Sequence, residues 1–288
     1  MFLPRKILEE KLRNMLAEDI GEGDVTTALI VSTGVSAEAE VRCNEPGVVA
    51  GIEEATVLLE SLGLKVRASS EDGDEIRANQ ILMNISGDAR AILSVERTLL
   101  NLLSRMSGIA TGTRRLVKEV RKAKLKTRVA CTRKTAPGLL YFDKKAVLVG
   151  GGDTHRLHLD DMILIKDNHI AIAGGLQKAV RDAKERASFS KKIEVEVTSP
   201  ADALEAAKAG GDMVMLDNFS PEQIKKAIAL LKKKKMYGKI LLEASGGITK
   251  ENVVGFASTG VDVVSLGEIT NSSKALDISL KMVGLRKK

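Results

Sequence analysis

The sequence predicts an α/β protein in two parts, a first part of mixed helices and strands and a second part that forms an incomplete (β/α) barrel. Three observations predict this class. The first hundred residues mix helical and strand-like patterns, the second half alternates short apolar runs with helical segments, and polar residues stand at the end of each run. Short apolar strands that alternate with helices form parallel sheets covered by helices.

In the first part, helical spacing and strand alternation are clear enough to place five elements. These are a helix over 5–18, a strand over 35–43, a helix over 53–63, a strand over 65–69 and a helix over 88–122. The segments 17–27 and 71–76 are rich in Gly and acidic residues, which predicts a loop and a turn. We expect a break at Gly108 and Gly112, where one domain ends and the next begins.

The second part repeats one pattern. Its strand-like runs are 127–134, 162–168, 193–199, 212–218, 239–247 and 261–268, and the helical segments 175–187, 200–210, 221–235 and 249–260 separate most of them. A full barrel of this kind has eight strands. Six strands therefore favour an incomplete barrel, with an open doubly wound sheet as the alternative.

Composition excludes several classes of protein. The chain has 288 residues, of which 44% are hydrophobic and 29% charged, which is typical of a soluble globular protein. Its longest apolar runs are far shorter than the roughly 20 residues that cross a bilayer. The start lacks the pattern of a cleavable signal peptide, and two cysteines are too few for a disulfide framework, so we expect a cytoplasmic protein without a membrane partner.

The formal charge of +7 raises the question of nucleic acid. Only 2% of the residues are aromatic, which leaves little for bases to stack on, and the basic run 232–235 is typical of a solvated helix end. We therefore expect no nucleic-acid partner. Small polyanionic substrates explain the charge better.

The polar strand ends carry the chemistry. They are Thr132, Arg133 and Lys134; Lys166, Asp167 and Asn168; Glu196; Asp217 and Asn218; Glu243, Ser245, Gly246 and Gly247; and Gly267 and Glu268. In a parallel barrel the carboxyl ends of all strands open on one face, where active sites are built. Loops are polar in any protein, but this explains one or two such strand ends better than six.

Sorted by chemistry, these residues describe a site for anions. The cationic strand-end residues are Arg133, Lys134 and Lys166. His155 and Arg156, which lie between the first two strand-like runs, complete this cationic group. Arginine binds carboxylates and phosphates with two parallel hydrogen bonds, and lysine supplies a point charge. Glu196 and Asp217 offer the hard oxygen ligands of Mg²⁺. The glycine turns at 245–248 and 265–267 offer backbone N–H groups to a phosphate.

Each feature also has a simpler interpretation. The turn at 245–247 also occurs as a plain tight turn, and Glu194 and Glu196, on one face of their strand, also fit structural ion pairs. His155, His158 and His169 suggest zinc, but their spacing lacks the Glu of a metalloprotease helix. Cys131 fits a small apolar strand residue better than a nucleophile.

Eight runs along the chain resemble one family. They are ERTLLNLLSRMSGIAT (96–111), TRKTAPGL (132–139), GGGDTHR (150–156), LIKDNHI (164–170), EVEV (194–197), MLDN (215–218), EASGGI (243–248) and SLGEIT (265–270). In this order they resemble the quinolinate phosphoribosyltransferases, also called carboxylating nicotinate-nucleotide pyrophosphorylases. The chain departs from the common pattern at Leu140, where the family often has Arg, and at Asn271, where it often has His.

The resemblance implies a fold and an assembly. The fold is a mixed α/β N-terminal domain (1–107), an irregular α/β barrel (108–270) that carries the active site, and a C-terminal segment (271–288) that returns to the first domain. The assembly is a homodimer or larger homo-oligomer with shared active sites, in which Arg97 enters the site of the neighbouring subunit.

The resemblance also implies a reaction, in which phosphoribosyl pyrophosphate and quinolinate give nicotinate mononucleotide, pyrophosphate and CO2 with Mg²⁺ and without an organic cofactor. Lys134, Lys166, Glu196 and Asp217 would be catalytic. The residues that line the substrate pocket would be Arg97, Thr132, Arg133, Lys134, His155, Arg156 and Lys166. Glu196 and Asp217 would hold the sugar and the metal, and Ser245, Gly246, Gly247, Leu266, Gly267 and Glu268 the 5′-phosphate.

Overall fold

The computed structural model describes residues 3–286, and the chain divides into two compact units. Unit 1 holds the chain up to Gly112, the segment Tyr141–Gly150 and the chain from Ser273 onward. Unit 2 holds Thr113–Leu140 and Gly151–Ser272. The units are therefore discontinuous in sequence, and a ten-residue segment of unit 1 comes between two segments of unit 2.

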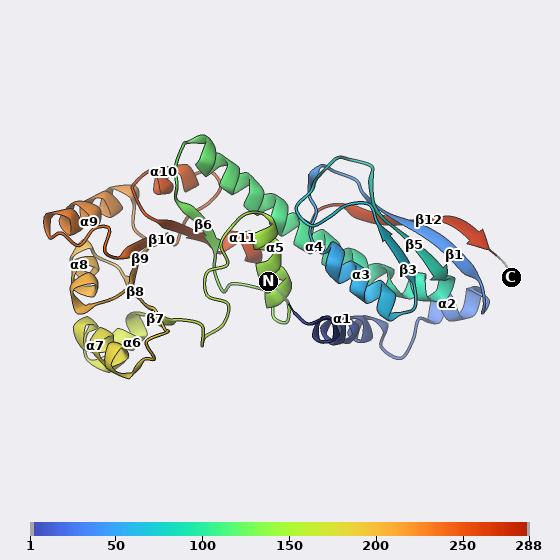
Figure 1. Ribbon diagram of the computed structural model, residues 1–288, viewed down its shortest axis with the longest axis horizontal. Coiled ribbons are helices and arrows are strands. Elements are labelled where there is room, and N and C mark those ends of the chain that lie inside the picture. The colour runs from blue at the N-terminus through green and yellow to red at the C-terminus, as the bar shows by residue number, and fades with distance from the viewer. Residues whose placement is uncertain (1–2, 287–288) are drawn as a thin grey trace. The chain divides into compact units, whose positions relative to one another are not determined.

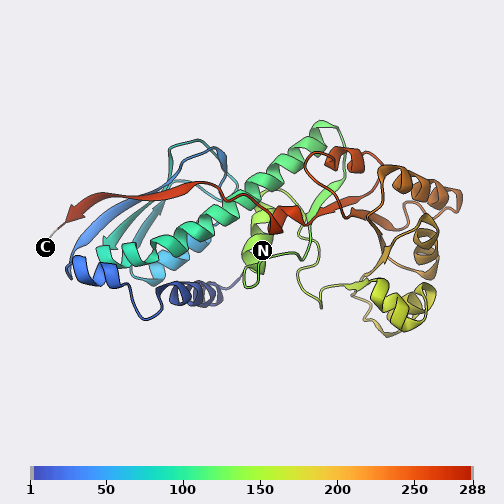
Figure 2. The ribbon, with the colours of Figure 1, turned by 180° about the vertical axis from the view of Figure 1, so that it is seen from behind.

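Unit 1 is built around an antiparallel sheet with the strand order β12-β1-β5-β3. Its strands are β1 (Ser36–Cys43), β3 (Lys65–Ala68), β5 (Gln80–Asp88) and β12 (Ile278–Arg286), with β2 (Gly47–Val48) and β4 (Glu75–Ile76) as a separate pair. Every second residue of β1 is buried, as the alternation in its sequence predicts. Figure 2 shows the C-terminal strand β12 running beside β1, with which it pairs along its length.

The helices of unit 1 are α1 (Arg5–Ile20), α2 (Val25–Ile30), α3 (Ile52–Ser61), the first two thirds of α4 (Ala89–Lys122) and nearly all of α5 (Leu140–Val149). The loop expected over 17–27 is wrong in part, because α1 extends to Ile20 and α2 begins at Val25. Asp24 caps α2, since its Oδ1 accepts a hydrogen bond from the Thr27 backbone N at 2.9 Å.

The break expected at Gly108 and Gly112 is wrong for the helix, because α4 continues through both, although unit 1 does end at Gly112 and unit 2 begins at Thr113. Gly108 has another role. A Cβ there would lie 2.1 Å from the carbonyl oxygen of Lys274, so glycine lets the segment before β12 cross the helix closely. Sequence alone cannot distinguish a glycine that ends a helix from one that admits a neighbouring backbone.

Unit 2 is the expected incomplete barrel. Six parallel strands have the order β6-β11-β10-β9-β8-β7. They are β6 (Arg128–Cys131), β7 (Ile163–Ile165), β8 (Ile193–Val197), β9 (Met213–Asp217), β10 (Leu241–Ser245) and β11 (Val263–Leu266). From β7 to β11 each strand pairs with the next in the chain, and β11 then pairs with β6. This order is that of a barrel with one seam left open, and it has no reversal such as a doubly wound sheet requires.

Helices follow most of these strands: α6 (Asp167–Ala173), α7 (Leu176–Arg186), α8 (Pro200–Ala209), α9 (Pro221–Lys233), α10 (Val253–Ala257) and α11 (Glu268–Asn271). Figure 1 shows α7, α8 and α9 along the outer face of the sheet. The starts of α8 and α9 are clear in the sequence, because Ser199 and Ser220 are their N-caps and a proline follows each cap. No helix among the described residues is long and apolar enough to cross a membrane.

Candidate active site

The carboxyl ends of the six parallel strands bring most of the predicted site residues to one end of unit 2. Thr132, Arg133 and Lys134 follow β6; Lys166 follows β7; Glu196 lies in β8; Asp217 ends β9; Ser245 ends β10, with Gly246 and Gly247 after it; and Leu266 ends β11, with Gly267 and Glu268 after it. Arg97 alone among the predicted residues lies in unit 1, where it is exposed on α4.

His155 and Arg156 reach the same end by a different route. The segment before them runs beside β6, where Asp153 forms an isolated parallel bridge with Ala130. The Asp153 backbone N donates to the Val129 carbonyl at 2.8 Å, and the Cys131 backbone N donates to the Asp153 carbonyl at 3.0 Å. This bridge lies at the free edge of β6 and brings the segment that carries His155 and Arg156 alongside the barrel.

Lys166 and Glu196 form an ion pair across the ends of β7 and β8. Lys166 is also held by its backbone, because its N–H donates to Nδ1 of His169 at 3.0 Å at the start of α6. The neighbouring strands thus place one cation against one carboxylate at the strand ends. A bound anion would compete with Glu196 for Lys166.

Asp217 is held by the turn that follows β9. Asn218 Nδ2 donates to Asp217 Oδ2 at 2.8 Å, and the Asn218 backbone N donates to the Ser245 carbonyl at 2.8 Å. Asn218 has φ +55°, and Gly246 has φ +89°. A Cβ on Gly246 would lie 2.2 Å from Asn218 Oδ1, so the turns after β9 and β10 are packed directly against each other.

The Lys134 loop is tied to the turn after β11. Thr132 Oγ1 accepts from the Lys134 backbone N at 3.1 Å, and buried Thr270 donates its hydroxyl to the Lys134 carbonyl at 2.8 Å. A Cβ on Gly267 would lie 2.9 Å from Lys134 Cδ and 3.7 Å from Asn271 Nδ2. Thr270, which the sequence did not select, therefore flanks the Lys134 loop, as does Asn271, which the sequence marked only as a departure from the family pattern.

His155 contacts two buried carboxylates inside the barrel. Its Nε2 lies 3.0 Å from Glu243 Oε2 and 3.3 Å from Glu194 Oε2, and the Ser265 hydroxyl donates to Glu243 Oε1 at 2.6 Å. Both glutamates are fully buried. We name His155, Glu194, Glu243 and Ser265 the histidine cluster.

The charges of the histidine cluster are coupled. Burial lowers the pKa of His155, and its contacts with Glu194 and Glu243 raise it. The Arg156 backbone N–H donates to Nδ1 at 2.7 Å. In this conformation Nδ1 therefore carries no proton and the ring is neutral, with its proton on Nε2 beside the two carboxylates. Burial raises the pKa of the Glu194 carboxyl, which His155 counteracts.

Arg156 lies within electrostatic reach of Arg133. Its pKa is lowered from the ordinary value, first by burial and then by the charge of Arg133. The two guanidinium groups repel each other, and a bound dianion would offset this repulsion. The geometry of this end of unit 2 thus suits an anionic substrate.

The zinc and nucleophile interpretations find little support. Among residues 3–286, the one group of three or more His, Cys, Asp or Glu ligands that could surround an ion is His155 with Glu194 and Glu243, and it contains neither His158 nor His169. Cys131 is a free, buried cysteine, and its Sγ lies 3.4 Å from the Thr154 carbonyl oxygen. Its burial fits a strand residue rather than a nucleophile.

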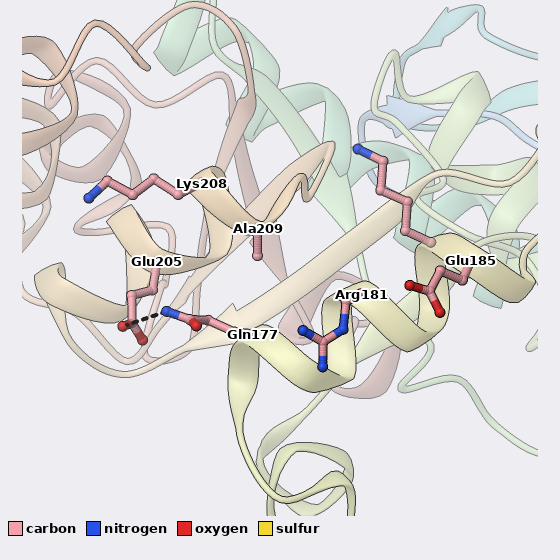
Figure 3. Close-up of a pocket in the computed structure, with 7 residues that line it drawn as sticks. Gln177, Arg181, Glu185, Glu205, Lys208 and Ala209 are labelled. Atoms are coloured by element: carbon pink, nitrogen blue, oxygen red, sulfur yellow. Dashed lines mark hydrogen bonds between the residues drawn. The ribbon is translucent and has the colours of Figure 1, made fainter.

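A groove of about 530 Å³ lies elsewhere on unit 2, between α7 and α8. Figure 3 shows its lining, in which Gln177 hydrogen-bonds to Glu205 and Arg181 and Lys208 extend from their helices. Both cations and carboxylates line it, and none of its residues is at a strand end. We therefore place the candidate site at the strand ends and not in this groove.

Comparison with known proteins identifies relatives over nearly the whole chain. The family model described as quinolinate phosphoribosyl transferase, C-terminal domain, matches residues 109–281, and the model of the N-terminal domain of the same family matches residues 24–107.

Named relatives agree with the family models. A chain of Methanothermobacter thermautotrophicus named "Probable nicotinate-nucleotide pyrophosphorylase (carboxylating)" is 46% identical over 275 residues, which are 96% of this chain and 99% of that one. The human nicotinate-nucleotide pyrophosphorylase (carboxylating) is 37% identical over 98% of this chain and 94% of its own. The crystal structure of NadC from Streptococcus pyogenes is similar with a TM-score of 0.90, at 38% identity and 99% coverage of both chains.

Proposed function

Because the chain belongs to the quinolinate phosphoribosyl transferase family, we propose that it joins quinolinate to phosphoribosyl pyrophosphate and releases CO2 and pyrophosphate. The product is nicotinate mononucleotide, a precursor of NAD. The observation that carries this proposal is the match of nearly the entire chain to relatives named nicotinate-nucleotide pyrophosphorylase (carboxylating), at 37% and 46% identity. The expectation that the sequence raised about the family is confirmed.

The charge of the strand ends supports an anionic pair of substrates. We assign Arg133, Lys134, Arg156 and Lys166 to the carboxylates of quinolinate and to the pyrophosphate, and His155 to the same pocket. Quinolinate carries two carboxylates, and arginine matches a carboxylate with two parallel hydrogen bonds. The mutual repulsion of Arg133 and Arg156 gives such a dianion a favourable place to bind.

The turns after β10 and β11 suit the 5′-phosphate of the sugar. Gly246 and Gly247 both have positive φ, at +89° and +63°, a conformation that glycine adopts readily and that lets a ligand approach the backbone closely. We assign Ser245, Gly246 and Gly247, together with Leu266, Gly267 and Glu268, to this phosphate.

Glu196 and Asp217 fit a magnesium ion that is shared with the pyrophosphate. They are hard oxygen donors on the adjacent strands β8 and β9, and Mg²⁺ usually takes one or two carboxylates from the protein and its other ligands from phosphate and water. Bound there, Mg²⁺ would neutralise charge on the leaving pyrophosphate. No organic cofactor enters the proposed reaction.

The proposed reaction has two steps. The quinolinate nitrogen forms a bond to C1 of the ribose as the bond to pyrophosphate breaks, and pyrophosphate leaves with the electron pair. Lys134 and Lys166 stabilise that charge. The ring nitrogen is now cationic, so the bond from C2 to its carboxylate can break. CO2 leaves, the electron pair stays on C2 beside the cation, and C2 then takes a proton.

We further propose that the chain works as a homodimer or larger homo-oligomer in which Arg97 completes the site of the neighbouring subunit. The other proposed site residues belong to unit 2, whereas Arg97 is exposed in unit 1. Its exposed position leaves a cationic side chain available to a second copy. The proposed partners are the two substrates and other copies of the chain, without nucleic acid or membrane, and the cytoplasmic location stays a prediction that cell fractionation tests.

A turnover assay tests the reaction. The chain, phosphoribosyl pyrophosphate and Mg²⁺ are supplied with carboxyl-labelled quinolinate or with nicotinate, and nucleotide and CO2 are measured. We expect one CO2 for each nucleotide and a preference for quinolinate on the order of 10⁴, because nicotinate leaves the cations of one carboxylate unpaired. Efficient use of nicotinate would indicate a transferase of this fold that acts on another base. Salt-sensitive binding of RNA or DNA without turnover would favour a nucleic-acid module.

A further inference from the structure

The histidine cluster occupies both ring nitrogens of His155. Nε2 faces Glu243 and Glu194, and Nδ1 accepts the Arg156 backbone N–H at 2.7 Å. Neither nitrogen is left for a carboxylate of the substrate in this conformation. His155 is therefore better placed to hold its own neighbours than to bind the substrate.

The backbone of His155 is held in an unusual conformation. Its φ is +52°, in the left-handed region that residues other than glycine seldom adopt. The His155 backbone N donates to Asp153 Oδ1 at 2.9 Å, next to the bridge that joins Asp153 to β6. Strain of this kind persists only where surrounding contacts fix it. On the side facing the barrel, the contacts of the ring with Glu243 and Glu194 fix this backbone conformation.

Glu243, which holds the His155 ring, is itself held by a hydrogen bond. Glu243 Oε2 contacts the ring, while Glu243 Oε1 accepts the Ser265 hydroxyl at 2.6 Å. These residues lie in β10 and β11, which pair directly. The chain of contacts thus runs from two strands of the barrel, through the imidazole, to the backbone amide of Arg156.

We infer that His155 is a positioning residue and that Glu243, supported by Ser265, is the group through which the barrel holds it. The ring fixes the Arg156 backbone, and the Arg156 guanidinium meets a carboxylate of the substrate. This inference rests on the proposed function, because it assumes that quinolinate is that substrate.

Ring-nitrogen NMR tests the geometry independently of activity. The chain has three histidines, so a protein labelled with ¹⁵N-histidine gives three ring systems, which His158→Gln and His169→Gln assign. We expect Glu243→Gln to shift the His155 nitrogens strongly. Quinolinate should shift them much less. A quinolinate-induced shift as large as that of Glu243→Gln would show direct contact and overturn the inference.

Kinetics test the consequence for the substrate. Glu243→Gln should raise KM for quinolinate by about tenfold or more, the effect of weakening one hydrogen bond to a charged group, and change KM for phosphoribosyl pyrophosphate by less than about twofold. Ser265→Ala should act in the same direction and more weakly. If Glu243→Gln fails to fold, Ser265→Ala still carries the test. His158→Gln, on the exposed part of the same loop, is the matched control and should leave both KM values unchanged.

Three results would contradict the inference. One is a loss of thermal stability in both variants with unchanged KM for quinolinate, which indicates a purely structural cluster. Another is an equal rise in both KM values. The third is a stoichiometric metal in the purified wild type that Glu243→Gln removes, because the three ligand atoms lie within 4.8 Å of one another and would then form a metal site. Absence of quinolinate turnover in the wild type would instead refute the proposed function, while the NMR comparison of wild type and Glu243→Gln would still test the ring contacts.

Discussion

Gly246→Ala should be much more harmful than the same change one residue later. Gly246 and Gly247 both have positive φ, so alanine is strained at either position by about 1–2 kcal/mol. Their surroundings differ. A Cβ at 246 would lie 2.2 Å from Asn218 Oδ1 and 3.0 Å from the Asn218 backbone N, whereas a Cβ at 247 would have no atom within 4 Å.

The extra cost at 246 follows from what Asn218 holds. To admit the methyl group, Asn218 must move and lose its 2.8 Å hydrogen bond to Asp217 Oδ2, and its backbone N must shift from the Ser245 carbonyl. Because Asn218 is exposed, we assign this loss about 1–2 kcal/mol beyond the backbone strain. For a chain of this size, that corresponds to a Tm lower than that of Gly247→Ala by about 2–8 °C.

Thermal unfolding of the two variants measures the difference, since both place alanine at a positive φ and only one places it against Asn218. Asn218→Gly provides a second check, because it removes the side chain that the methyl group would strike. Gly246→Ala should therefore cost clearly less in the Asn218→Gly background than in the wild type. Equal Tm values for Gly246→Ala and Gly247→Ala, or strict additivity with Asn218→Gly, would refute the reasoning.

Two further predictions concern the charges of the site. Glu196→Gln and Asp217→Asn should raise the Mg²⁺ concentration needed for half-maximal turnover without changing quinolinate binding by calorimetry, and full activity at low Mg²⁺ would contradict this. Finally, mixing inactive Arg97→Ala with inactive Arg133→Ala should restore part of the activity after subunit exchange, whereas no recovery would contradict a shared site.

The sequence predicts the parallel sheet well because each of its strands is a short apolar run and most have a helical segment after them. It predicts α5 poorly, because the charged residues of α5 suggest exposure. In the structure, Asp143 is fully buried, where it accepts hydrogen bonds from Arg105 Nε and Nη2 at 2.7 and 2.8 Å. Lys145 is buried too, with its Nζ 2.7 Å from Glu54 Oε1. Burial of this kind depends on partners from about 40 to 90 positions away, which local patterns do not reveal.

The candidate site divides in the same way. Residues at strand ends can be predicted from the sequence, because parallel topology alone brings all such ends to one side. The contacts of Ser265 with Glu243 and of Thr270 with the Lys134 carbonyl are different, since they depend on which strands are neighbours and in what register. A polar residue at every second position of an apolar strand, as at Glu243 and Ser245, was the one available sign that the barrel interior is polar.

That polar interior is itself an argument for function. The interiors of such barrels are filled mainly by branched apolar side chains, which cost nothing to bury. Here Glu194 is buried with neither carboxylate oxygen hydrogen-bonded among the described residues, a condition that costs about 1–3 kcal/mol or more for a charged group. Its Oε2 lies 3.3 Å from His155 Nε2, and its charge acts favourably on Arg156. An apolar residue there would avoid this cost, but it would remove the carboxylate that contacts His155 and acts favourably on Arg156. The buried acids therefore lower stability where they help to assemble a site that attracts anions.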